Sequence, residues 1–235
     1  MVIESRIFAL VFRLGAIAVI VTGLVRLVGL FGGGGGTSGG SGGAAWGAFV
    51  YYTTQSNVLC LLWLAAMAVV TIRGMARDGR RGPVEPWPRL GAMVMMAITV
   101  TMLIYLVVLA PAAFVQEGDG YRPFTLTDDL IHIITPCLTI ADWFLFSPKG
   151  RLRWFDPITW AIPPYIYLLF GFTWPLFGGR FAGGQRYPYS FMDVGTLGVG
   201  GVALQIGVLT VALVAFGYIY VVADYLLARA ARKRV

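Results

Sequence analysis

The one histidine of the 235-residue chain, His132, lies inside a segment that is otherwise apolar enough to be a membrane span. Its neighbours Ile131, Ile133 and Ile134 remove water from the imidazole and favour the uncharged ring, which is the form that accepts a proton. An ionisable side chain at membrane depth indicates a functional site. The alternative is a histidine that only joins two helices by a hydrogen bond. His132 is therefore the first candidate for a general base.

A run of polar residues at the start of a second apolar segment supplies the candidate nucleophile. The run is Thr53, Thr54, Gln55, Ser56 and Asn57. Such side chains can simply hold neighbouring helices together, but five in succession exceed what helix association usually needs. A neutral histidine is the commonest partner that activates a hydroxyl, so Thr53 and His132 together predict acyl transfer. Thr54 and Ser56 are the rival nucleophiles.

The other polar residues near this pair are expected to support it. Asp128 precedes His132 by four residues, so on a helix their Cβ atoms lie about 5 to 6 Å apart and the carboxylate can orient the imidazole. Helix capping is a sufficient alternative explanation for this carboxylate. Gln55, Ser56 and Asn57 are candidates for the polar wall of the pocket, and either amide is a candidate donor to the oxyanion.

The composition indicates which elements must position these residues. Hydrophobic residues make up 58% of the chain and charged residues 12%, and the mean hydropathy is +0.77. These values exclude an ordinary soluble globule and indicate an all-α, polytopic membrane protein. We expect one domain, 1–235, with a bundle of six transmembrane helices of about 20 residues or more. The predicted spans are about 7–31, 49–72, 90–110, 125–146, 155–177 and 194–227, with a flexible glycine-rich loop at 32–45.

The net charge of +7 is distributed unevenly between the two sides of this predicted bundle. Segments on one side carry thirteen Lys and Arg residues, whereas the opposite loops carry three, Arg122, Arg180 and Arg186. Excess positive charge marks the cytoplasmic side, so both termini are predicted to be cytoplasmic. The basic charge is then explained by topology and by contact with anionic membrane lipids, and no nucleic-acid partner is expected.

This topology brings the candidate nucleophile and base to a similar depth. Spans 49–72 and 125–146 both run inward from the outer surface, and Thr53 and His132 lie roughly 8 and 11 Å along them. We expect the two side chains to meet in a pocket that opens between spans and admits an apolar, lipid-like ester.

A charged residue inside the first span, Arg13, has two readings. A long arginine near a span end can snorkel to the interface. Alternatively, Arg13 pairs with a carboxylate at similar depth, for which Asp142 and Asp224 are the candidates. Such a pair would fasten the predicted cytoplasmic half of the bundle.

Two other classes of function remain open from the residues alone. The polar face can bind a lipid or carry a small solute without catalysis, or His132 and Asp128 can serve a proton-coupled carrier. A metal enzyme is not expected, because one histidine and two separated cysteines, Cys60 and Cys137, cannot build a zinc site. No cofactor is predicted.

Several stretches of the sequence also resemble a known family. They are YYTTQSN, DDLIH followed by TPCL, SPKGRLRWFD and YPYSFMDV. Together they resemble the six-span androgen-induced-protein superfamily, which includes the androgen-dependent TFPI-regulating protein, and especially its bacterial branch. Animal members hydrolyse fatty acid esters of hydroxy fatty acids with an intramembrane threonine and histidine, and the matching positions here are Thr53 and His132. The resemblance covers nearly the whole chain and implies an ester hydrolase of a bacterial inner membrane.

Overall fold

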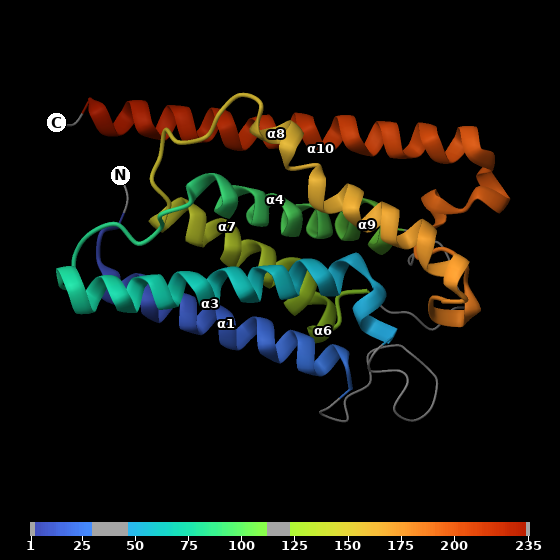
Figure 1. Cartoon of the computed structure of the whole chain (residues 1–235), viewed down its shortest axis with the longest axis horizontal. Coiled ribbons are helices and arrows are strands. Elements are labelled where there is room, and N and C mark those ends of the chain that lie inside the picture. The colour runs from blue at the N-terminus through green and yellow to red at the C-terminus, as the bar shows by residue number, and fades with distance from the viewer. Residues whose placement is uncertain (1–2, 30–46, 112–122, 234–235) are drawn as a thin grey trace.

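The computed structural model describes residues 3–29, 47–111 and 123–233. The glycine-rich loop predicted at 32–45 lies outside these residues. Every named element in the described part of the chain is a helix, which confirms the all-α class (Figure 1).

Five helices in the described part of the chain are long and apolar enough to cross a membrane. A helix of 22 residues, such as the first, is about 33 Å long and matches a bilayer core of about 30 Å. The five are α1 (Arg6–Leu27), α3 (Tyr52–Asp78), α4 (Pro88–Ile104) with the π-helical η2 (Tyr105–Leu109), the succession of α6 (Leu126–Asp129), π-helical η3 (Leu130–Ile134) and α7 (Thr135–Phe146), and α10 (Val194–Arg232).

The fifth predicted span, 155–177, consists of three shorter helices. They are α8 (Asp156–Thr159), α9 (Ile162–Thr173) and the 3-10 helix η4 (Trp174–Phe177). Each begins with proline in its first turn, where the missing N–H costs no hydrogen bond. With 12 residues, α9 is about 18 Å long and too short to cross the hydrocarbon alone. Six uninterrupted spans are therefore not confirmed. The remaining elements are the 3-10 turns η1 (Ala48–Val50), η5 (Ala182–Gly184) and η6 (Ser190–Met192).

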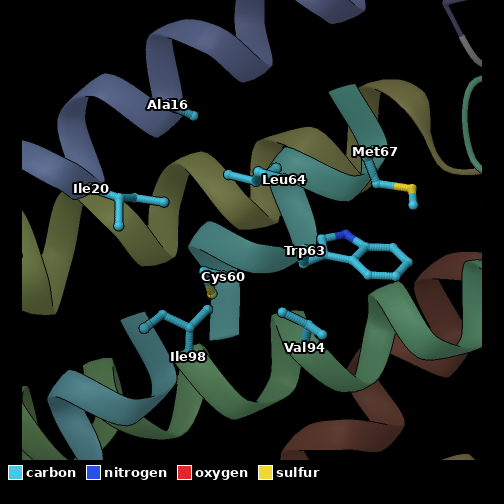
Figure 2. Packing of buried hydrophobic residues seen from close by; sticks show 8 residues of the cluster. All are labelled: Ala16, Ile20, Cys60, Trp63, Leu64, Met67, Val94 and Ile98. Carbon is cyan, nitrogen blue, oxygen red and sulfur yellow. The ribbon is translucent and has the colours of Figure 1, made fainter. Parts of the chain in front are cut away.

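The packed centre of the molecule is formed by α1, α3, α4 and α7. Figure 2 shows its main cluster, in which Ile20 of α1, Leu64 of α3 and Ile98 of α4 are fully buried. The long α10 lies along one side of this group and packs against α8. The start of α1 and the end of α10 lie at the same end of the molecule (Figure 1).

A buried ion pair near the start of α1 joins three of these helices. Arg13 Nε donates to Asp142 Oδ1 of α7 at 2.8 Å, which confirms the predicted pairing. Arg13 Nη1 also donates to Thr71 Oγ1 of α3 at 3.0 Å and to the Val84 carbonyl at 3.1 Å. The other candidate, Asp224, accepts instead from a main-chain N–H of the loop after α7. Because a buried charge must keep its partner, these bonds fix the height of α7 against α1 and α3.

The loop between α3 and α4 inserts a carboxyl group into the same end of the bundle. Glu85 is 4% exposed, and its Oε1 lies against Gly91 of α4, where a Cβ would collide with it and with Trp63. The pKa of the Glu85 carboxyl is raised to about 7, chiefly by burial and also by the nearby Asp142 charge, while Arg13 opposes the shift. The fold therefore holds a carboxyl whose ionisation is costly.

Candidate active site

A π-helical turn interrupts the fourth span where the candidate base lies. In a regular α-helix the Thr135 N–H would bond to the Ile131 carbonyl, four residues back. Here the Thr135 N–H bonds to the Leu130 carbonyl, and the next residue, Pro136, has no N–H to offer. The Ile131 carbonyl is therefore available to a donor from another helix. Single π turns inside α-helices are frequent at functional sites.

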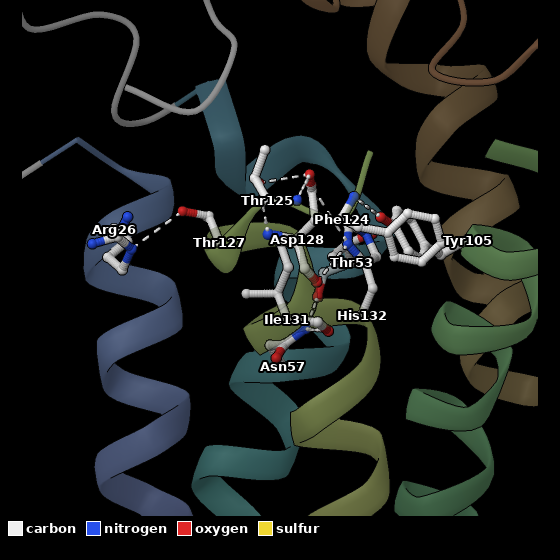
Figure 3. A network of polar contacts seen from close by, with 10 residues as sticks. All are labelled: Arg26, Thr53, Asn57, Tyr105, Phe124, Thr125, Thr127, Asp128, Ile131 and His132. Carbon is white, nitrogen blue, oxygen red and sulfur yellow. Dashed lines mark hydrogen bonds and ion pairs between the residues drawn. The ribbon is translucent and has the colours of Figure 1, made fainter. Parts of the chain in front are cut away.

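Asn57 of α3 uses this carbonyl to hold the two candidate catalytic residues together. Its Nδ2 donates to the Ile131 carbonyl at 3.0 Å and to the Thr53 carbonyl at 2.8 Å (Figure 3). One amide thus links the turn that carries Thr53 with the turn that carries His132. The Thr53 Oγ1 to His132 Nε2 distance is 3.3 Å, which is hydrogen-bonding reach for a nucleophile and its base.

The imidazole is oriented by a main-chain oxygen. His132 Nδ1 lies 3.2 Å from the Asp128 carbonyl oxygen, which can only accept a hydrogen bond. In this bond Nδ1 carries the proton, so Nε2 is left as the acceptor for the Thr53 hydroxyl. The His132 side chain is 7% exposed, and the low hydration favours this neutral ring.

The Asp128 side chain caps the helix, and it makes no hydrogen bond to the imidazole that it was expected to orient. Its Oδ2 accepts from Thr125 Oγ1 at 2.7 Å, and the two residues form a capping box at the start of α6. Its Oδ1 lies 3.9 Å from His132 Nδ1, longer than a hydrogen bond. The carboxylate therefore acts on the imidazole through its charge, while the carbonyl of the same residue sets the ring direction.

Tyr105, which the sequence analysis did not single out, covers one face of the imidazole. Its ring stacks on His132 with centroids 4.2 Å apart and planes 8° from parallel. The Tyr105 hydroxyl accepts from the Phe124 N–H at 2.8 Å. Phe124 has φ 61°, the one positive φ among the non-glycine residues that the structure describes, and such strain tends to gather at functional sites. Phe124 bonds Tyr105, and Tyr105 stacks on His132. Tyr105 in η2 and His132 in η3 both lie in π-helical turns.

The rest of the polar run forms bonds within the protein. Ser56 Oγ lies 2.7 Å from Thr101 Oγ1 of α4, and Thr54 Oγ1 donates to the Ala48 carbonyl at 2.7 Å. Gln55 Nε2 donates to the Phe49 carbonyl at 3.2 Å near the surface. Of the three hydroxyls in the run, Thr53 is the one bonded to His132. The amides of Gln55 and Asn57, which we expected near the oxyanion, are engaged elsewhere.

A cavity of about 340 Å³ begins at Thr53 and His132. Its walls come from α4, η2, α9 and α10 and are mostly aliphatic and aromatic. Two of its lining residues, Val107 and Tyr165, are 69% and 48% exposed, so the cavity is partly open to the outside of the bundle. A largely apolar cavity of this size with a few polar groups is typical of a small-ligand site.

Comparisons of the chain with models of protein families, with curated proteins and with solved structures find no match. Within the described residues, no group of three or more His, Cys, Asp or Glu side chains could hold a metal ion.

Proposed function

We propose that this protein is an intramembrane threonine hydrolase that cleaves lipophilic esters, of which fatty acid esters of hydroxy fatty acids are the candidate class. The observation that carries the proposal is the 3.3 Å approach of Thr53 Oγ1 to His132 Nε2 at the wall of an apolar cavity. The sequence resemblance to the androgen-induced-protein superfamily, with its intramembrane threonine and histidine, points to the same pair.

The proposed reaction uses the two side chains in turn. Thr53 Oγ1 attacks the ester carbonyl carbon while its proton passes to His132 Nε2. The bond to the alcohol oxygen then breaks, and His132 returns the proton to the departing alcohol. Water attacks the resulting acyl-threonine with His132 again as base, which releases the fatty acid and restores the Thr53 hydroxyl. The neutral, Nδ1-protonated ring favours the first of these steps.

The proposal includes a six-span topology with both termini in the cytoplasm of a bacterial cell, in its inner membrane. Since α1 begins and α10 ends at the same end of the molecule, an even number of crossings is needed (Figure 1). The successive helices α8, α9 and η4 supply the sixth crossing beside the five long helices. The excess of Lys and Arg in the loops at that end supports its cytoplasmic placement.

An ester with long alkyl chains fits the position of the cavity. The cavity walls belong to apolar helices, and some of its lining residues are exposed on the outside of the bundle. A substrate dissolved in the bilayer can therefore enter from the side, with its ester group at Thr53 and its alkyl chain between α4, α9 and α10.

The test is covalent labelling by a fluorophosphonate probe in membranes or detergent. We expect the wild-type protein to be labelled and Thr53→Ala and His132→Ala to remain unlabelled. Thr54→Ala is the matched control, because its hydroxyl bonds the Ala48 carbonyl and its loss should leave labelling intact. Equal labelling of all four proteins would refute the hydrolase.

The same cavity favours a second candidate, a protein that binds a lipid or carries a small solute, including by proton-coupled transport, without hydrolysis. Its walls suit an alkyl chain whether or not the ester is cleaved. Lipid binding that is unchanged in Thr53→Ala and His132→Ala, together with no hydrolysis of any ester in a library, would favour this candidate over the enzyme.

A further inference from the structure

An ester hydrolase needs a hydrogen-bond donor for the carbonyl oxygen that becomes negatively charged during attack. The amides considered for this task are already engaged: Asn57 Nδ2 holds two main-chain carbonyls, and Gln55 Nε2 bonds the Phe49 carbonyl. The donor must therefore come from another residue near Thr53 that also faces the cavity.

Tyr189 meets both conditions. It belongs to the stretch YPYSFMDV between α9 and α10, and it lines the cavity. Its hydroxyl lies near the Thr53 and Tyr167 side chains, which line the same cavity, and the Tyr167 and Tyr189 ring centroids are 6.1 Å apart. The ring is held by stacking on Phe191, with centroids 5.4 Å apart and planes 5° from parallel. A residue far along the chain thus reaches the candidate nucleophile.

The direction of the neighbouring hydrogen bonds leaves the Tyr189 hydrogen free to donate. Each hydroxyl has one hydrogen. That of Thr53 is directed to His132 Nε2 at 3.3 Å, and that of Tyr167 to the Val50 carbonyl at 3.2 Å. Neither hydroxyl hydrogen is therefore directed at Tyr189. A charged oxygen that appears beside them accepts more strongly than either neutral hydroxyl.

The first turn of α3 prepares the phenol for this role. The Tyr52 N–H has no partner within the helix, as is general for the first N–H groups, and it lies near the Tyr189 side chain. Exclusion of water raises the pKa of the Tyr189 phenol to about 12. The phenol therefore keeps its hydrogen at neutral pH, while the N–H beside its oxygen strengthens it as a donor.

On the basis of the proposed hydrolase, we infer that Tyr189 is a catalytic residue that donates its phenolic hydrogen to the ester carbonyl oxygen as Thr53 attacks. The attacking oxygen and the carbonyl oxygen share one carbon, so a donor within reach of Thr53 Oγ1 is also close to the developing oxyanion. Tyr189 remains protonated throughout: its hydrogen bond shifts to the oxyanion and returns when the carbonyl re-forms.

The test compares the kinetics of Tyr189→Phe with those of the wild type. The change removes one oxygen and keeps the ring, so we expect kcat to fall by about 10²- to 10³-fold with little change in KM. Tyr187→Phe is the matched control, because Tyr187 lies in the same stretch and packs edge-on against Phe172. It should hydrolyse the ester at the wild-type rate.

Two inhibitors separate a donor to the oxyanion from a residue that only shapes the cavity. An alkylboronic acid forms a tetrahedral adduct on a hydroxyl nucleophile, whereas an ether analogue of the ester has no carbonyl oxygen. Tyr189→Phe should bind the boronic acid more weakly by about the factor lost in kcat/KM and bind the ether analogue as the wild type does. Equal weakening of both would assign Tyr189 to packing and overturn the inference.

The outcomes also separate this inference from the proposed function. If the wild type hydrolyses the ester, Thr53→Ala does not, and Tyr189→Phe keeps the wild-type kcat, then Tyr189 is not the donor although the hydrolase stands. If the wild type hydrolyses no ester, both are refuted.

Discussion

At the scale of single residues, the position of Thr53 against His132 depends on one amide. Asn57 joins their two helices through main-chain carbonyls, and its own Oδ1 is buried without a hydrogen-bond partner (Figure 3). A buried acceptor without a partner costs free energy, so the Asn57 side chain carries an energetic cost in the folded state. The pairing of Thr53 and His132 could be predicted from the single histidine and from equal depth. The Asn57 bridge could not, because it requires a carbonyl that a regular helix would not offer.

We therefore expect Asn57→Ala to impair catalysis and stability together. The change leaves the Ile131 carbonyl buried without its donor, which costs about 1 to 3 kcal/mol, and it frees Thr53 to move away from His132. A shift of about 1 Å between reacting groups can lower the rate about 10²-fold. Ester hydrolysis and thermal unfolding in detergent measure the two effects. Gln55→Ala, which removes an amide bonded near the surface, should change stability by less than about 0.5 kcal/mol. A wild-type rate in Asn57→Ala would disprove the bridge.

The two tyrosines near the candidate site, Tyr105 and Tyr189, could not be singled out from the sequence. Tyr105 and Tyr189 are two of 11 tyrosines in a chain with 14% aromatic residues, and no spacing distinguishes them. Tyr105 reaches His132 from α4, and Tyr189 reaches Thr53 from the segment before α10. Their roles depend on how distant segments pack, which a local pattern does not contain.

At the scale of elements, irregular turns decide what the helices can do. Hydropathy predicted four spans that correspond to α1, to α3, to α4 with η2, and to α6 with η3 and α7. Most of the predicted span ends lie within a few residues of the helix ends. It also predicted a span at 155–177, and prolines in the first turns of α8, α9 and η4 divide this span into shorter helices. In the fourth span, a π-helical turn lies just before Pro136. Hydropathy records burial in lipid and carries no information on such breaks.

Pro136→Ala tests whether the π turn serves the site. Alanine supplies the missing N–H and favours a regular helix, so the Ile131 carbonyl should be taken by the Thr135 N–H and lost to Asn57. We expect the melting temperature to stay the same or rise, while ester hydrolysis falls at least about tenfold through misplacement of His132. Pro163→Ala, in the first turn of α9, is the control and should leave the rate unchanged. Unaltered hydrolysis in Pro136→Ala would show that the site does not need the π turn.

At the scale of the whole molecule, the two ends of the bundle carry different chemistry. The candidate site lies where α3 and α6 begin, and the buried ion pair of Arg13 and Asp142 lies toward the other end, where Glu85 also enters. The ion pair was predictable from the depths of the two charges. The burial of Glu85 was not, because a glutamate in a loop rich in arginine is ordinarily solvated. The arrangement of α9 and α10 around the cavity was likewise not predictable, since both helices are apolar on many sides.

Glu85 gives the molecule a stability that depends on pH. Its pKa is raised in the folded protein to about 7, above the ordinary 4.5, so the folded state holds this proton more tightly than the unfolded chain does. The stability contributed by the protonated group is complete below about pH 4.5, is lost as the pH rises to about 7 and is then constant. The loss is on the order of 3 kcal/mol.

Glu85→Gln should remove this dependence. We expect the variant to melt at a higher temperature than the wild type at pH 8 and at a similar temperature near pH 4.5, as measured by thermal unfolding in detergent. Glu4→Gln is the control, because Glu4 is exposed, and its melting curve should follow the wild type at both values. A variant less stable than the wild type at pH 8 would mean that the Glu85 charge is favourable in the fold.

The opening of the cavity to the outside of the bundle determines how such an enzyme would respond to its surroundings. A substrate that arrives through this opening comes from the lipid phase, so the reaction velocity would follow the mole fraction of ester among the lipids and not its amount per volume of buffer. Dilution of the ester with inert phospholipid would slow turnover even at constant total ester. Tighter acyl packing in a cold membrane would do the same by hindering lateral entry.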